Sequence, residues 1–199
     1  GDDLDSVIDD RTLLVITDTH RADFVENPEV YKKCKNIVVI DHHRKAVDAI
    51  DNAVIFYHET ATSSTCEMVS ELMQYIDSFY LPKLGAEALL GGIMLDSKNF
   101  CLHTGVRTFE AAAYLRSCGA DTVEVKKLFA DSMLTYSRKT AIVSSAKLYK
   151  DCAISFDTES DAVTRVASSQ AADELLNLEN INASFVMYNN NGTVNISAR

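Results

Sequence analysis

Two short apolar runs each end in side chains that can bind a metal ion. Leu13 to Thr17 is followed by Asp18, with His20 two positions further on, and Asn36 to Ile40 is followed by Asp41-His42-His43-Arg44. Carboxylates and neutral imidazoles are ligands of Mn²⁺, Fe²⁺ and Zn²⁺, and a carboxylate can bridge two ions. A single Asp here can equally cap a helix, and a single His is more often a hydrogen-bonding residue. Because the pair occurs twice, the pattern favours a metal-phosphate site.

The same two runs predict the elements that position these side chains. They are short, β-branched and without polar alternation, which is typical of strands buried on both faces of a parallel sheet. The segment between them, with a helix from Pro28 to about Lys35, is too long for a hairpin. Ala53 to Tyr57 is a third candidate strand. The sequence therefore predicts an α/β fold with a parallel sheet, whose carboxyl edge is where ligands bind.

Asp96 is a third candidate acid for this site. It ends the apolar run Ala86 to Leu95, which we expect to be a helix opened by Pro82. It could simply be a helix-terminal turn residue. An acid at a helix C-terminus is disfavoured by the dipole, which favours a functional role in the same cavity as Asp18 and Asp41.

Two further segments begin predicted helices. Ser64 and Glu67 fit a capping box for a helix that runs to about Phe79, although hydroxyls and amides at a helix start also suit an anion. Arg107 follows the turn at His103 to Gly105 and begins a helix through Arg116, where an Arg is more often a surface residue.

The pattern changes after Lys150. A strand at 152–156, a helix at 162–178 and a hairpin at 183–198 with an Asn-Gly turn predict a second domain at about 148–199. Helices at 121–132 and 134–147 precede it. Ser197 and Arg199 share one face of the last strand, where the Arg could fork onto a phosphate or simply be solvated.

The composition of the chain limits the classes of function that it can have. The net charge of −10 over 199 residues makes the chain a poor candidate for duplex nucleic acid binding. A small anionic substrate stays compatible, because bound cations reverse the local charge. Five scattered cysteines without a Cys-x-x-Cys spacing indicate thiols in a reducing compartment. No apolar stretch reaches membrane-spanning length, so we expect a cytoplasmic segment without direct membrane contact.

Six segments in order resemble one family, the GdpP (YybT-like) cyclic-di-AMP phosphodiesterases of the DHH group. They are Asp18-Thr19-His20, Asp41-His42-His43-Arg44, Ser63-Ser64-Thr65, Asp96-Ser97-Lys98-Asn99-Phe100, Thr104-Gly105-Val106-Arg107-Thr108 and Ile196-Ser197-Ala198-Arg199. The resemblance implies a parallel-sheet DHH domain at 1–120, connecting helices at 121–147 and a smaller α/β DHH-associated, substrate-binding domain at 148–199. It also implies Mn²⁺-dependent hydrolysis of cyclic di-AMP to pApA, in a segment of a larger membrane-tethered protein.

The resemblance also implies a role for each matching residue. Asp18 would bridge two Mn²⁺ ions, with His42 and Asp96 ligating one of them. Asp41 would orient the cluster, His43 and Arg44 would face the scissile phosphate, with His43 as proton donor, and His20 would lie near the site without ligating. The residues that would contact the substrate, in part across a cleft between the domains, are Ser64, Thr104, Arg107, Ser197 and Arg199.

Two family motifs have no counterpart here. These are a His followed by Asp-x-Asp before Gly1, and a Gly-Gly-Gly-His segment after Arg199. We therefore expect an internal fragment that holds one ion or none, binds metal weakly and turns over poorly. The alternatives are a phosphodiesterase acting on short oligonucleotides such as pApA, and a non-catalytic nucleotide-binding module. Homodimerisation stays open.

Overall fold

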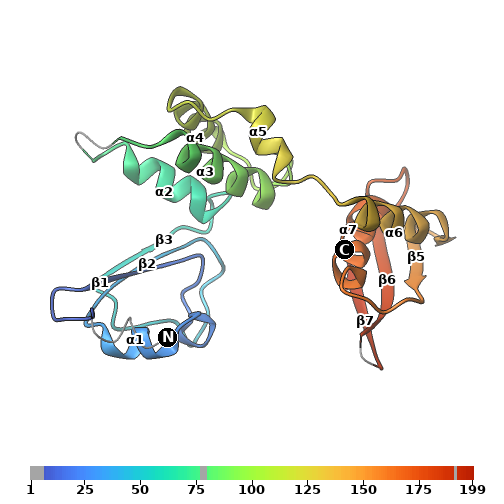
Figure 1. The fold of residues 1–199 in the computed structure, drawn as a ribbon, viewed down its shortest axis with the longest axis horizontal. Coiled ribbons are helices and arrows are strands. Elements are labelled where there is room, and N and C mark those ends of the chain that lie inside the picture. The colour runs from blue at the N-terminus through green and yellow to red at the C-terminus, as the bar shows by residue number, and fades with distance from the viewer. Residues whose placement is uncertain (1–6, 77–79, 191) are drawn as a thin grey trace. The chain divides into compact units, whose positions relative to one another are not determined.

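The apolar runs at 13–17 and 36–40 form neighbouring parallel strands in the computed structural model, which describes residues 7–76, 80–190 and 192–199 (Figure 1). Strands β1 (Leu13–Thr17), β2 (Asn36–Asp41) and β3 (Ile55–His58) form a parallel sheet in that order. The central strand β2 carries the fully buried Ile37 and Val39. The predicted parallel sheet is therefore confirmed.

The register of this sheet brings the two strand ends together. Thr17 pairs with Ile40, and the backbone N–H of Asp18 donates to the carbonyl of Ile40 at 3.0 Å. A 3₁₀ turn, η2 (Ala22–Phe24), and helix α1 (Pro28–Lys33) form the crossover. Asn27 caps α1 through its side chain, so Pro28 opens the helix as predicted.

Four helices complete the first unit: α2 (Thr65–Met73), α3 (Lys83–Asp96), α4 (Val106–Ser117) and α5 (Thr122–Lys127). Their shared core includes the fully buried Ile93, Leu115 and Val125. Helix α2 ends at Met73 rather than near Phe79; residues 77–79 lie outside the described residues. Helix α5 also ends earlier than predicted. Among the described residues, no helix is long and apolar enough to cross a membrane.

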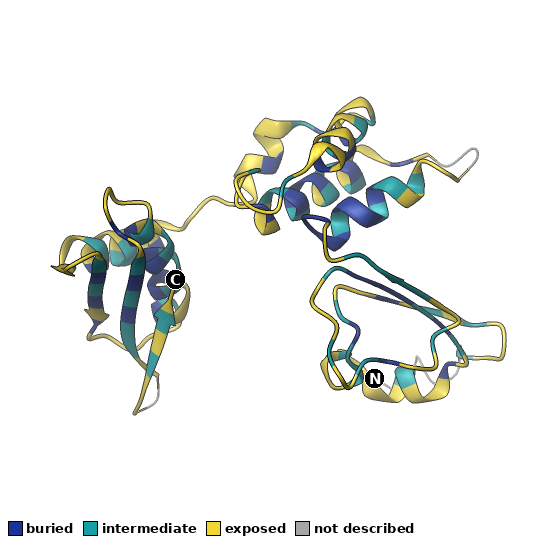
Figure 2. Cartoon of the chain, turned by 180° about the vertical axis from the view of Figure 1, so that it is seen from behind, coloured by how far each residue is buried: buried dark blue, intermediate teal, exposed yellow. Residues whose placement is uncertain are grey.

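The second unit is a four-stranded sheet covered on one face by two helices. Its elements are α6 (Met133–Ser144), β4 (Lys147–Tyr149), β5 (Cys152–Asp157), α7 (Thr164–Leu176), β6 (Ala183–Asn190) and β7 (Thr193–Ala198). The strand order is β4-β5-β6-β7, with only the β5–β6 pair parallel. Buried residues gather where the helices pack on the sheet (Figure 2). The predicted hairpin is confirmed, whereas β4 was not predicted.

Along the chain, the boundary between the two units lies between Phe129 and Ala130. The predicted connecting segment 121–147 is thus divided. Helix α5 joins the first unit because Val125 packs with Leu90 and Leu115, and α6 joins the second because Ile142 packs in the core that contains Leu175.

Candidate metal and phosphate site

The three predicted metal ligands, Asp18, His42 and Asp96, converge in the first unit. The Nε2 atom of His42 lies 3.6 Å from Oδ1 of Asp18 and 3.8 Å from Oδ2 of Asp96. These residues come from the ends of three elements, β1, β2 and α3. An imidazole nitrogen flanked by two carboxylates is a mixed nitrogen and oxygen donor set that suits a divalent first-row metal ion.

Asp18 adopts a conformation that is costly for a residue other than glycine. Its φ of 64° lies in the left-handed region, for which backbone strain of about 1–3 kcal/mol is typical. The hydroxyl of Thr65, at the start of α2, donates to Asp18 Oδ1 at 3.0 Å. Helix α2 thus helps to hold the carboxylate of Asp18 at the sheet edge.

The charges at this point are poorly balanced without a cation. Burial and the neighbouring charge of Asp18 raise the pKa of Asp96, although His42, His43 and Lys98 act in the opposite direction. Asp96 is therefore held beside Asp18 at the expense of its own ionisation. A bound divalent cation would remove this repulsion, so the residues present fit a metal ion.

A cavity of about 560 Å³ opens over these side chains, within the range typical of small-molecule sites. Its lining combines acids, imidazoles and hydroxyls: Asp18, His42, His43, Arg44, Thr60, Thr62, Ser63, Asp96 and His103. Thr60, Thr62, Ser63 and His103 were not predicted. The sequence signal for Thr60 and Thr62 was only their place between the third predicted strand and the next helix, whereas Ser63 lies in the segment Ser63-Ser64-Thr65 that contributes to the family resemblance.

Asp41 lies beneath the cavity and organises the histidines. Its side chain is fully buried, and Oδ1 accepts hydrogen bonds from the backbone N–H groups of His42 (2.9 Å) and His43 (3.3 Å) and from Nδ1 of His43 (2.7 Å). Although burial opposes it, the hydrogen bonds from His20 and His43 lower the pKa of Asp41. The hydrogen bond with Asp41 raises the pKa of His43. Asp41 is therefore placed to orient other groups and not to touch a substrate.

His20 is engaged at both ring nitrogens. Its Nδ1 is hydrogen-bonded to Asp41 Oδ2, and its Nε2 accepts the backbone N–H of Ala46 at 2.8 Å. His20, Asp41 and His58 lie close enough together to hold an ion. Since neither nitrogen of His20 has a free lone pair, however, this residue clamps the loop after β2 and does not act as a ligand. The structure thus places His20 near the site.

Two predicted substrate contacts are engaged within the protein. The Ser64 side chain is buried and accepts the backbone N–H of Glu67 at 3.1 Å, which is the predicted cap. Ser63, not Ser64, lines the cavity. The Thr104 hydroxyl donates to the carbonyl of Leu102 at 3.0 Å.

Arg107 is paired with a carboxylate outside the cavity that contains Asp18. Its guanidinium donates to both carboxylate oxygens of Glu71, at 2.8 and 2.6 Å, and this pairing raises its pKa. The pair lines a separate cavity of about 730 Å³ with Tyr57 and Tyr75. Arg107 therefore does not lie at the cluster of Asp18, His42 and Asp96.

Ser197 and Arg199 lie in the second unit, on the sheet face covered by α7. Ser197 pairs with the buried Val186, and Arg199 donates from Nε to Asp173 at 2.7 Å and from Nη2 to Ser169 at 2.6 Å. Their contact with a substrate stays a prediction.

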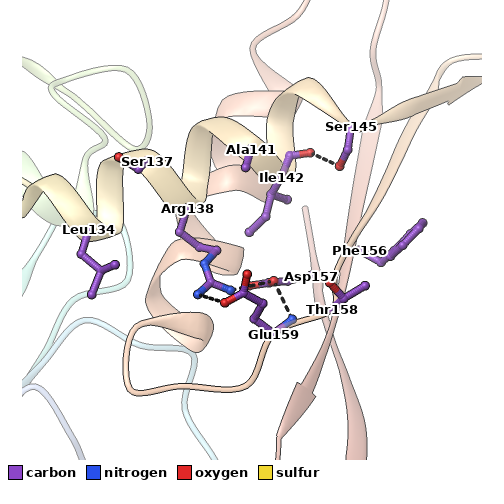
Figure 3. A pocket seen from close by; sticks show the side chains of 10 residues that line it. All are labelled: Leu134, Ser137, Arg138, Ala141, Ile142, Ser145, Phe156, Asp157, Thr158 and Glu159. Carbon is purple, nitrogen blue, oxygen red and sulfur yellow. Dashed lines mark hydrogen bonds and ion pairs between the residues drawn. The ribbon is translucent and has the colours of Figure 1, made fainter.

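The second unit has a cavity of its own, of about 550 Å³, between α6 and the end of β5 (Figure 3). There Arg138 pairs with Asp157 at 3.1 Å, Glu159 at 2.7 Å and Asp161 at 2.6 Å. Through its ion pairs with three acids, Arg138 ties the loop before α7 to α6.

Residues 1–93 match the family described as "DHH family, N-terminal domain". This matched part of the chain contains Asp41-His42-His43 at the end of the second strand.

The chain is also similar to two named enzymes. It is 41% identical over 182 residues to cyclic-di-AMP phosphodiesterase PdeA of Listeria monocytogenes, covering 90% of this chain and 28% of that protein. It is 41% identical over 198 residues to cyclic-di-AMP phosphodiesterase GdpP of Bacillus subtilis, covering 97% of this chain and 30% of that protein. The chain therefore spans less than a third of the length of these relatives.

The fold is shared with a crystal structure of an exopolyphosphatase-related protein from Bacteroides fragilis. The TM-score is 0.80 at 21% identity, over 94% of this chain and 58% of that one. This likeness supports the mixed α/β fold alone.

Proposed function

We propose that this protein is a Mn²⁺-dependent phosphodiesterase that hydrolyses cyclic di-AMP to pApA. The observation that carries the proposal is the placement of His42 Nε2 between the carboxylates of Asp18 and Asp96, at 3.6 and 3.8 Å. The similarity to two cyclic-di-AMP phosphodiesterases over most of the chain supports the substrate.

Asp18, His42 and Asp96 would hold the cation. Once bound, the cation would activate a water molecule and offset phosphate charge. The family resemblance implies two ions in the intact site, and Asp18 would be one of the ligands that hold them. The repulsion that raises the pKa of Asp96 supports a cation between these acids.

His43 is proposed as the proton donor to the leaving oxygen. Asp41 holds its Nδ1 at 2.7 Å, so Nε2 is the nitrogen left to act on a substrate. The hydrogen bond that raises the pKa of His43 favours the doubly protonated ring that a general acid requires. The proton would pass from Nε2 to the ribose oxygen as the phosphorus–oxygen bond breaks.

Arg44 is proposed to bind the scissile phosphate. It lines the cavity beside His43 and forms no ion pair within the described ranges of the chain. A free guanidinium can donate two parallel hydrogen bonds to phosphate oxygens. Ser197 and Arg199 are retained as proposed substrate contacts of a DHH-associated domain in the second unit.

The test is a hydrolysis assay on the protein at the length that is produced in its own cells. After removal of metal, we expect pApA from cyclic di-AMP only when Mn²⁺ is restored, and loss of turnover in Asp96→Asn and His43→Asn. Asp51→Asn, an exposed acid, is the control.

Unchanged turnover in Asp96→Asn would overturn the proposal. Faster release of AMP from pApA than of pApA from cyclic di-AMP would instead assign a short-oligonucleotide phosphodiesterase. Binding of cyclic di-AMP without any turnover would assign a nucleotide-binding module.

A further inference from the structure

His103 is an unassigned imidazole in the cavity above the Asp18, His42 and Asp96 cluster. It lines this cavity, its side chain is exposed, and it makes no hydrogen bond or ion pair with any residue in the described ranges. The other two cavity-lining imidazoles differ: His42 lies beside two carboxylates and His43 is bonded to Asp41. His103 is thus available to a ligand.

The backbone that carries His103 is held in an unusual conformation. Lys98, Asn99, Phe100 and His103 all have φ between 49° and 63°, the left-handed region that residues other than glycine rarely adopt. Such strain persists where the surroundings impose it, and it concentrates at ligand sites.

The bonds that impose this conformation start at the end of α3. The carbonyl of Ser97 accepts the N–H groups of Cys101 and Leu102, both at 2.8 Å, and its hydroxyl accepts the N–H of Phe100 at 2.9 Å. The ring of Phe100 stacks on that of Phe109, with centroids 5.4 Å apart. The loop therefore presents His103 from a fixed frame that begins one residue after Asp96.

The lining around His103 is suited to a phosphate. It offers the hydroxyl of Thr60 and the unpaired guanidinium of Arg44. The hydroxyls of Thr62 and Ser63 are already used, since they donate to the carbonyl of Glu59 and the carboxylate of Glu67. No Phe or Tyr among the described residues lines this cavity, so it lacks the apolar aromatic platform on which a base usually stacks. A cyclic dinucleotide carries two phosphates, and only one of them can lie at the metal ligands.

We propose that His103 is a substrate-binding residue whose imidazole donates a hydrogen bond to the phosphate that is not being cleaved. The proposal rests on the proposed function and deepens it. His103 thereby distinguishes a substrate with two phosphates from a simple phosphodiester with one.

The test compares two substrates, cyclic di-AMP and bis(p-nitrophenyl) phosphate, which has a single phosphate. In His103→Ala we expect KM for cyclic di-AMP to rise roughly 10-fold or more, the usual worth of a hydrogen bond to a charged group. We expect hydrolysis of bis(p-nitrophenyl) phosphate and the Mn²⁺ affinity, measured by calorimetry, to stay unchanged. His103→Arg should restore a low KM for cyclic di-AMP, whereas His103→Phe should not.

Three results would overturn the proposal. The first is an unchanged KM for cyclic di-AMP in His103→Ala. The second is an equal loss of activity with both substrates, which would indicate a part in the metal centre. The third is a low KM for cyclic di-AMP in His103→Phe, which would indicate stacking on a base. If the wild-type protein hydrolyses neither substrate, the proposed function fails on its own. The role of His103 is then tested by calorimetric titration of the protein with cyclic di-AMP in the presence of Mn²⁺. His103→Ala must bind cyclic di-AMP more weakly than wild type does. Equal affinity in the two proteins, or no binding by wild type, overturns the assignment.

Discussion

At the scale of single residues, the buried carboxylate of Asp41 determines how the two following histidines point. It accepts two backbone N–H groups and one ring N–H on Oδ1, while Oδ2 faces His20. His42 is left with Nε2 toward Asp18 and Asp96, and His43 is left with Nε2 free. The Asp of the Asp-His-His sequence thus acts on the site through its neighbours.

The clamp formed by His20 can be tested by unfolding. His20→Ala should destabilise the protein by about 2–4 kcal/mol, because it removes two buried hydrogen bonds and leaves part of the Asp41 carboxylate unpaired. Urea denaturation measures this loss. His103→Ala, at an exposed and unpaired position, should stay within about 0.5 kcal/mol of wild type. Equal stability of His20→Ala and wild type would show that the clamp is absent.

Cys66 gives a second prediction for a single side chain. Burial, together with the charges of Asp96 and Asp18, raises the pKa of its thiol to about 11. At pH 8 iodoacetamide should therefore alkylate Cys66 roughly 100-fold more slowly than the exposed Cys101, since only the thiolate reacts. The Cys66 rate should rise steadily with pH toward its pKa. Peptide mass spectrometry follows both sites, and similar rates for the two folded-state thiols would refute the prediction.

Much of the candidate site could be predicted because its chemistry lies at the ends of recognisable elements. Asp18, His42 and Asp96 each follow an apolar run, and parallel strands bring such ends to one edge. Arg107 shows what sequence cannot supply. The partner of Arg107 is Glu71, 36 positions away, and no local pattern announces that pair.

At the scale of elements, the strands and helix starts were predictable, whereas several helix ends were not. Asn27, Ser64 and Pro82 mark the starts of α1, α2 and α3, because capping chemistry is local. Helices α2 and α5 end early without a proline or glycine stop, and β4 has only three residues. The periodicity of apolar residues alone therefore does not mark these bounds.

The contact between α2 and α3 depends on Gly92. A Cβ built there would lie 2.2 Å from the sulfur of Cys66, so Gly92→Ala must separate the two helices. Overpacking costs about 1–3 kcal/mol, partly offset by the roughly 1 kcal/mol that Ala gains over Gly in a helix. We expect a net loss of stability by thermal unfolding, because the helix preference offsets only part of that cost.

A second substitution in α3 controls for the helix preference. At Gly85 the nearest atom is the methyl end of the flexible Leu81 side chain, so Gly85→Ala should cost less. Cys66→Ala should recover part of the stability lost in Gly92→Ala. If Gly92→Ala proved as stable as Gly85→Ala, the close packing of α2 on α3 would be disproved.

At the scale of the whole molecule, the chain consists of two units with separate cores. The first unit contains clusters around Ile37 and Leu115, and the second contains one around Leu175. The sequence indicated two domains, because the change of pattern after Lys150 is visible. The boundary at Phe129 and Ala130 was not predicted, because only the core partners of α5 and α6 show to which unit each helix belongs.

Separate cores predict separate responses to metal. A cation held by Asp18, His42 and Asp96 stabilises only the unit that contains them. At a Mn²⁺ concentration 100 times its Kd, the added stability is about 2.7 kcal/mol. Differential scanning calorimetry should therefore show one transition that Mn²⁺ moves upward and one that it leaves in place. A single transition that moves as a whole would contradict the independence of the units.

The claim on which the function depends is that Asp18, His42 and Asp96 hold one divalent cation. Isothermal titration of the metal-free protein with Mn²⁺ tests it most directly, with each residue replaced in turn by Asn and with Asp51→Asn as control. We expect each of the three substitutions to weaken Mn²⁺ binding at least about 10-fold. Replacing a residue that only hydrogen-bonds to a metal ligand already lowers metal affinity by about that factor. Asp51→Asn should bind as wild type does. Wild-type affinity in His42→Asn and Asp96→Asn would contradict the account.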